Sequence, residues 1–188
     1  MCKVDHFFEL FNNELESKIF NAVRMNNVYE TGITVVQKPE KDLAERRSKV
    51  VSKILSAEMG ETTTVISSMS ASCVFVSAMF LFKRKNMKER LRKGALPGSP
   101  CMPSANGWMD CMLFLRYMEH FIQYTHPTEN GFILLIFDGY HSHKSLEVVE
   151  LAKANHITLL TIPPHPSHQL NVTNFGPLKA MYDSEVDK

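Results

Sequence analysis

The sequence predicts an α/β domain in which helices flank a mixed β-sheet. Two patterns carry this prediction: β-rich runs between residues 49 and 82, and a strand–helix–strand pattern over residues 132–162. The chain has 188 residues, a length typical of one domain with a core of useful size. Hydrophobic residues at 44% and charged residues at 22% exclude a disordered, collagen-like or coiled-coil chain.

The first half of the chain predicts one helix followed by strands. Apolar residues recur at helical spacing over residues 5–23, and the β-branched residues 33–36 indicate a strand. The β-rich runs 49–56 and 62–70 flank a glycine-containing connection, which is typical of a hairpin. The apolar run 73–82 predicts a third strand.

The second half predicts a loop, then helix, strand, helix and strand. A Pro- and Gly-rich loop over residues 95–107 precedes helical periodicity from residue 108 to residue 124. The continuous apolar runs 132–137 and 157–162 suit strands buried on both faces, with a helix between them that starts at Ser142 or Ser145. Such a unit predicts parallel strands joined by a right-handed crossover.

Global charge and cysteine content restrict the cellular context. The formal net charge of +1 does not indicate a polyanionic partner. None of the four cysteines forms a C-x-x-C pair. No apolar run is long enough for a bilayer span of about 20 residues, and the start has no secretory h-region. We therefore expect reduced cysteines in cytoplasm or nucleus and no membrane partner. Nothing in the sequence indicates a small-molecule substrate.

One segment departs from this neutral balance. Residues 83–94 carry seven basic side chains and one acidic side chain. This density favours contact with phosphates, while a localisation signal and a solvated helix face are the alternatives. The basic residues are Lys83, Arg84, Lys85, Lys88, Arg90, Arg92 and Lys93.

Asp138 is the first candidate for chemistry. It follows a predicted buried strand, and ligands of open α/β sheets bind at the carboxyl ends of strands. The alternative is that Asp138 only caps the helix that follows it. Neighbouring parallel strands would bring a second polar loop beside it, so that His141, His143, His165 and His168 gather at one edge. A zinc site is one interpretation of these histidines, and bonding to backbone groups is the other.

Several stretches, in this order, resemble the catalytic core of the DDE endonucleases of the pogo/Tigger/Jerky transposase group, to which centromere protein B is related. The resemblance runs from about residue 7 to residue 179, and nine or so short motifs stand in register. The matching stretches are NVYETGITVVQKP, SAEMGE, MFLFKRKNMKERLRKGALPGS, the SGWM-like NGWM of residues 106–109, LFLRYMEHFI, ILLIFDGYHSHKSLEVVELAKANHITLLTIPPHPSHQL and NFGPLK.

The resemblance implies a ribonuclease H-like fold and phosphodiester chemistry. In that family three carboxylates hold two divalent cations, usually Mg²⁺, about 4 Å apart. Only the second acid is retained here, as Asp138. Tyr29 stands at the position of the first acid, and Asn171 is the best match to the third.

These replacements predict a catalytically inactive core. A tyrosine hydroxyl is a poor Mg²⁺ ligand, and an uncharged amide oxygen is weaker than a carboxylate. Glu30 is the nearest substitute ligand, but neighbouring residues of a strand point to opposite faces, so it would need a bulge to replace the lost acid. We therefore expect no tightly bound Mg²⁺.

Three functions follow from these observations. The first is an inactive transposase-derived domain in the nucleus that contacts DNA phosphates without sequence preference. The second is a metal-dependent nuclease that uses Asp138, Glu30 and a histidine such as His168. The third is a structural or protein-interaction domain.

The domain prediction places the DDE endonuclease-like core at residues 1–182 and a tail at residues 183–188. Relatives in the resembling group carry a helix-turn-helix module before the core and continue beyond it. We therefore expect the core to be truncated at its C-terminal end.

Overall fold

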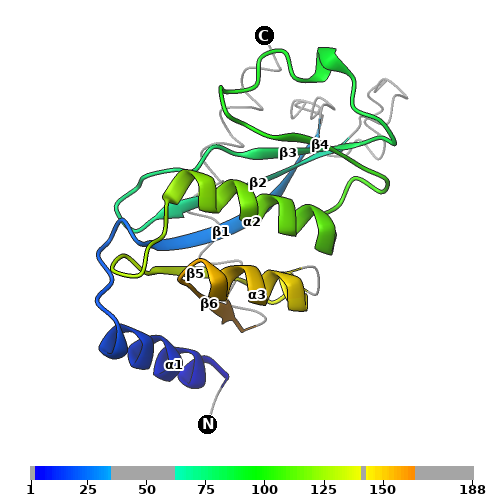
Figure 1. The fold of residues 1–188 in the computed structure, drawn as a ribbon. Helices are drawn as coiled ribbons and strands as arrows, with labels where there is room; N and C mark the ends of the chain where they lie inside the picture. Colours follow the sequence, from blue (N-terminus) through cyan, green and yellow to red (C-terminus); the bar gives the residue numbers. More distant parts are fainter. Residues whose placement is uncertain (1–2, 35–61, 141–142, 164–188) are drawn as a thin grey trace, which may run out of the picture.

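A six-stranded mixed sheet forms the centre of the molecule in the computed structural model, which describes residues 3–34, 62–140 and 143–163 (Figure 1). The strand order is β4-β3-β2-β1-β5-β6. The described strands are β1 (Met25–Thr34), β2 (Thr62–Ser70), β3 (Met79–Lys83), β4 (Cys101–Ser104), β5 (Ile133–Asp138) and β6 (Ile157–Ile162). Strand β2 runs antiparallel to β1 and β3, whereas β1–β5, β5–β6 and β3–β4 are parallel pairs. The predicted mixed sheet is confirmed.

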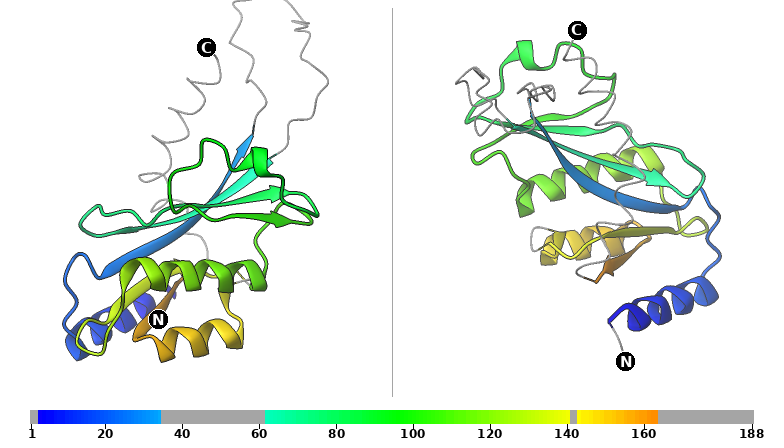
Figure 2. Two further views of the ribbon diagram at one scale, coloured as in Figure 1. Left: turned by 45° about the horizontal axis from the view of Figure 1, so that its top comes forward. Right: turned by 180° about the vertical axis from the view of Figure 1, so that it is seen from behind.

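Two helices cover one face of this sheet, and a third lies beside β6 (Figures 1 and 2). Helix α2 (Cys111–Thr125) and helix α3 (Leu146–Ala154) pack together on that face, and helix α1 (Lys3–Ser17) contacts the sheet at its β6 edge. None of the helices in the described ranges is long and apolar enough to cross a bilayer. The arrangement buries the helix-facing side of β1, β2 and β5.

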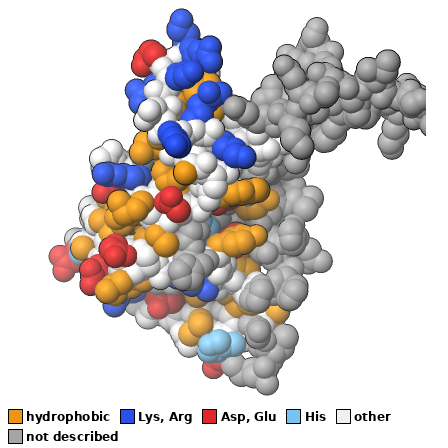
Figure 3. Space-filling model, turned by 90° about the vertical axis from the view of Figure 1, so that its right-hand side faces the viewer, with side chains coloured by type: hydrophobic (Ala, Val, Ile, Leu, Met, Phe, Trp, Pro, Cys, Tyr) orange, Lys and Arg blue, Asp and Glu red, His pale blue; other side chains and the backbone are white. Residues whose placement is uncertain are grey.

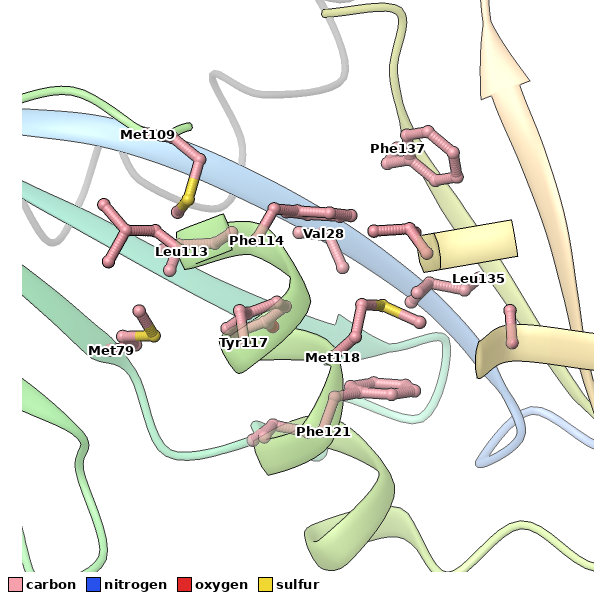
Figure 4. Packing of buried hydrophobic residues seen from close by; sticks show 14 of the residues in the cluster. Val28, Met79, Met109, Leu113, Phe114, Tyr117, Met118, Phe121, Leu135 and Phe137 are labelled. Atoms are coloured by element: carbon pink, nitrogen blue, oxygen red, sulfur yellow. The ribbon is translucent and has the colours of Figure 1, made fainter. Parts of the chain in front are cut away.

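Helix α2 supplies the centre of the core because its apolar residues repeat at helical spacing. Phe114, Tyr117, Met118 and Phe121 are all fully buried. Figure 4 shows them packed over residues of the sheet, including Leu135. The helix begins where the Asp110 carboxylate accepts the Leu113 N–H at 2.8 Å. This cap places the helix start slightly later than the periodicity predicts.

The strand–helix–strand unit agrees closely with its sequence pattern. Strands β5 and β6 pair in parallel from Ile133↔Ile157 to Asp138↔Ile162. The Ser145 hydroxyl accepts the Val148 N–H and caps α3, which decides between the two serines that the sequence left open. Asp138 is therefore not the cap of this helix.

The N-terminal boundaries differ from the prediction. Helix α1 ends at Ser17, because Asn21 forms a turn in which its side-chain oxygen accepts the Arg24 N–H at 3.0 Å. Strand β1 then begins at Met25, eight residues before the predicted strand. The polar side chain of Asn26 is buried in this strand but keeps a hydrogen-bond partner, since its Nδ2 donates to the Val23 carbonyl at 3.3 Å. Residues 35–36 of the predicted strand and the predicted strand 49–56 lie outside the described residues.

The predicted strand 73–82 is mostly wrong, since only its last four residues join β3. The Ser70 hydroxyl accepts the Val74 N–H at 3.1 Å, and Cys73 adopts a φ of 62°, so the chain turns back after β2. Residues 71–73 therefore form the turn between β2 and β3, and Phe75, which pairs with Met69 just after the turn, is exposed at 55%.

The predicted loop 95–107 contains a strand that the sequence analysis missed. Strand β4 carries Pro103 and pairs with β3 through Phe82↔Pro103. Proline is tolerated there because β4 is an edge strand of the described sheet, with only one neighbour to bond.

The core position of Phe121 gives a direct test of this packing. Phe121→Ala removes a fully buried ring, so we expect the free energy of unfolding in urea to fall by about 3–5 kcal/mol. Tyr124→Ala, on the exposed side of the same helix, is the matched control and should change it by less than about 0.5 kcal/mol. Equal losses in the two variants would contradict the assignment of the buried face.

Candidate functional site

Tyr29 and Asp138 lie at the carboxyl-end side of the pairing between β1 and β5. The last pair of this parallel ladder is Asn27↔Ile136, and Tyr29 and Asp138 follow two residues later on their strands. Side-chain alternation places Tyr29 on the face opposite α2. The Asp138 carboxylate, at the end of β5, reaches His143, whose ring stacks on Phe114 of α2. The fold thus places the candidate first and second acid positions at matching points of two neighbouring parallel strands.

The Tyr29 hydroxyl remains protonated in this environment. Burial raises the pKa of Tyr29, and the nearby Asp138 carboxylate raises it further. A phenol whose pKa lies above its usual value near 10 has no negative charge at neutral pH. Tyr29 therefore brings no anionic ligand to the position that it occupies.

Glu30 points to the other face of the sheet. The β1–β2 register runs without a bulge from Asn26↔Ser70 to Thr34↔Thr62, so Glu30 shares the helix-covered face with Val28. Its carboxylate accepts the backbone N–H of Met109, just before α2. Glu30 thus does not take over the place of an acid at position 29.

Burial also governs the ionisation of Glu30. It raises the pKa of the Glu30 carboxyl, although His143 opposes this effect, and the Asp138 carboxylate adds to the increase. The charged form of Glu30 is thus less favourable inside the fold than in water. Glu30 is a buried acid whose ionisation opposes folding.

His143 lies between the two acids. Its ring Nδ1 is 2.9 Å from Asp138 Oδ1, and its Nε2 is 4.0 Å from Glu30 Oε2. Its side chain is 3% exposed and stacks on Phe114 with the ring centroids 4.1 Å apart. Despite the short Nδ1–Oδ1 approach, neither ring nitrogen makes a hydrogen bond of good geometry within the described chain. The sequence predicted His143 near Asp138 but gave no sign that the ring is buried.

The described residues do not fit a pair of Mg²⁺ ions. Tyr29 is neutral, and the carboxylates of Glu30 and Asp138 both approach the ring of His143. Within residues 3–34, 62–140 and 143–163, no group of three or more His, Cys, Asp or Glu residues is placed to hold a metal. Two dications normally require several hard oxygen ligands with negative charge. Asn171 and the three other loop histidines, His141, His165 and His168, lie outside the described residues.

The basic segment forms an exposed loop rather than a helix. It starts at Lys83, the end of β3, and contains only one short 3₁₀ turn, Glu89–Leu91. Six of its seven basic residues are exposed, and Arg84 is half-buried. Figure 3 shows Lys and Arg side chains gathered at one end of the molecule, above a zone of hydrophobic side chains. We call residues 83–94 the basic loop.

Comparison with known proteins defines the family. Residues 81–187 match the DDE superfamily endonuclease family. The chain belongs to this family. The match includes the basic loop, α2, Asp138 and α3, so the predicted family relationship is confirmed.

Solved structures of Mos1 transposase share the fold of this DDE-family domain. The Mos1 strand transfer complex matches 96% of this chain and 46% of the Mos1 chain, with 13% identity and a TM-score of 0.61. The Mos1 catalytic domain bound to raltegravir and Mn matches 97% of this chain and 70% of that chain, with 9% identity and a TM-score of 0.55. The predicted ribonuclease H-like fold is confirmed.

One curated relative is similar over most of this DDE-family domain. It is a protein named MFS-type transporter clz9 from Cochliobolus lunatus, 34% identical over 149 residues. The match covers 77% of this chain and 16% of that protein. The chain thus spans about a sixth of the length of this relative.

The electrostatics of Glu30 predict a pH-dependent effect on stability. Because burial raises its pKa, Glu30 opposes folding when it is ionised and loses this effect on protonation. We expect Glu30→Gln to raise the melting temperature at pH 8, since glutamine is neutral and still offers an oxygen to the Met109 N–H. The gain should disappear below about pH 4, where the carboxyl is protonated in both folded and unfolded chains.

Thermal unfolding monitored by circular dichroism at the two pH values measures this difference. Glu150→Gln, on the exposed side of α3, is the control and should leave the melting temperature unchanged. A wild-type protein that is more stable than Glu30→Gln at pH 8 would contradict this reading of Glu30.

Proposed function

We propose that this chain is a transposase-derived DDE endonuclease-like domain that binds DNA phosphates and has lost phosphodiester cleavage. Membership of the DDE superfamily endonuclease family supports the evolutionary part of this proposal. Structures with the same fold include Mos1 paired-end complexes with transposon ends, which is consistent with a DNA partner. A nuclear location is part of the proposal, because the partner is DNA.

The basic loop carries the DNA-binding part of the proposal. Six exposed cations within twelve residues project from one end of the sheet, and one acidic residue, Glu89, accompanies them. Neutralising phosphates with such side chains releases counterions, which favours binding without reading the bases. Phosphate contacts alone predict no sequence preference.

The loss of cleavage is inferred from the ligands at the sheet edge. Asp138 is the candidate acid on its face, and the position beside it holds a neutral tyrosine. Each missing carboxylate removes a charge that would offset the repulsion between two dications. We therefore propose that Mg²⁺ binds weakly, although Mos1 paired-end complexes exist with Mg and with Mn.

Charge reversal in the basic loop tests DNA binding. We expect Lys85→Glu/Lys88→Glu to weaken binding of a 20-base-pair duplex, since both lysines are exposed and would contact phosphates. In fluorescence anisotropy, the slope of log K against log salt concentration should become shallower by about 2.

The matched control, Arg116→Glu/Lys153→Glu, reverses two exposed charges on α2 and α3 and should keep the wild-type slope. Equal weakening by both double variants would point to net charge rather than to the basic loop. Wild-type binding that does not depend on salt would favour the structural or protein-interaction alternative.

A plasmid-nicking assay tests the loss of cleavage. Supercoiled plasmid incubated with the protein and an excess of Mg²⁺ or Mn²⁺ should remain intact, and Asp138→Ala should behave identically. Nicking by the wild-type protein that is abolished in Asp138→Ala would instead establish a metal-dependent nuclease.

A further inference from the structure

Trp108 is an exposed indole on a rigid loop. It is the single tryptophan of the chain and is 59% exposed, just before the cap of α2. The backbone N–H of Trp108 donates to Asn106 Oδ1 at 2.9 Å, and the backbone carbonyl of Trp108 accepts the Ser104 hydroxyl at 2.7 Å. The preceding Gly107 carbonyl accepts the Thr64 hydroxyl at 2.7 Å. These bonds fix the backbone on both sides of the indole, so little backbone order is lost when a ligand stacks on it.

The backbone of this tryptophan loop adjoins the basic loop. Gly107 has a φ of 86°. Lys83 packs directly on this residue, since a side chain added to Gly107 would place its Cβ only 3.1 Å from Lys83 Cβ. The Arg84 N–H donates to the Ser104 carbonyl at 3.0 Å. The start of the basic loop and the loop that carries the indole are thus joined by packing and by a hydrogen bond.

On its C-terminal side, Trp108 is connected through Met109 to the acids Glu30 and Asp138. The next residue, Met109, is buried in the core (Figure 4) and donates its N–H to Glu30. Glu30 adjoins His143, which in turn lies against Asp138. Trp108 therefore stands between the cations of the basic loop and the Asp138 edge of the sheet.

We propose that Trp108 is a stacking platform for an unpaired DNA base, with the basic loop holding the adjoining phosphates. This inference rests on the proposed DNA binding and assigns the strand state that is preferred. An aromatic ring beside a row of cations is the usual chemistry of single-strand binding. In a duplex both faces of an interior base are already stacked, so the platform favours single-stranded or frayed DNA. Met112, in the first turn of α2, is a second exposed apolar side chain close to Trp108 in sequence.

The single tryptophan makes the platform directly observable. Titration of the full chain with a 15-nucleotide oligothymidylate should quench Trp108 fluorescence, whereas a 15-base-pair duplex should quench it much less. We expect Trp108→Ala, followed by anisotropy of a labelled oligonucleotide, to weaken single-strand binding on the order of tenfold. Stacking releases no counterions, so the salt slope should stay at its wild-type value.

Two further variants control for general effects of the substitution. Trp108→Phe should restore most of the affinity, because phenylalanine also stacks. Phe75→Ala removes another exposed ring, on the β2–β3 turn, and should change nothing.

The outcomes separate this inference from the proposed function. If Trp108→Ala binds single strands as well as wild type while Lys85→Glu/Lys88→Glu binds poorly, the platform is wrong and DNA binding stands. If wild type binds neither oligonucleotide nor duplex, both are overturned. If Trp108→Ala instead converts a dimer into a monomer in sedimentation velocity, with single-strand affinity unchanged, Trp108 belongs to a protein interface and the platform is overturned.

Discussion

The parallel pairing of β1 with β5 is the constraint on which the site depends. Both strands have hydrogen-bonded neighbours on each side, and their helix-facing residues are sealed by α2. A one-residue change in register would exchange the two faces of β5 and turn Leu135 away from α2. The fully buried Leu134 and Leu135 of β5 hold this register. The positions of Tyr29, Glu30 and Asp138 thus follow from core packing.

The charges of the side chains near the carboxyl ends of β1 and β5 then determine whether metal ions can bind there. The fold places positions 29 and 138 at matching points of neighbouring strands, and position 29 holds a neutral phenol where the family resemblance predicts an acid. Glu30 and Asp138 both approach the imidazole of His143, and burial keeps the Glu30 pKa raised. The fold of the DDE superfamily endonuclease family is therefore present, while no group of three or more potential metal ligands is found in the described residues. The proposed DNA contacts of the basic loop and Trp108 do not depend on a metal, so the proposed binding is compatible with the proposed loss of cleavage.

Part of this structure could be predicted from local pattern. Strand β6 and most of β5 were predictable because continuous apolar runs are typical of strands covered on both faces. The alternation rule also predicted that Glu30 would not replace an acid at position 29 unless β1 had a bulge, and the observed register has none.

Features decided by single side chains were harder to predict. The turn after β2 depends on the Ser70 hydroxyl within a run that otherwise reads as a strand. Strand β4 was not predicted because it contains Pro103, and proline is tolerated in a strand mainly at the edge of a sheet. The burial of His143 depends on its stacking against Phe114, a residue of α2 that is distant in sequence. Such contacts between distant segments leave no periodic signal in the chain.

The central proposal is that a neutral Tyr29 beside Asp138 leaves no site for paired cations among the described residues. Isothermal titration calorimetry of Mn²⁺ into the wild-type chain and into Tyr29→Asp tests it most directly. The account predicts no saturable binding at micromolar concentrations in the wild type and tighter binding once a carboxylate stands at position 29. Two Mn²⁺ ions bound per wild-type chain, and lost in Asp138→Ala, would contradict it.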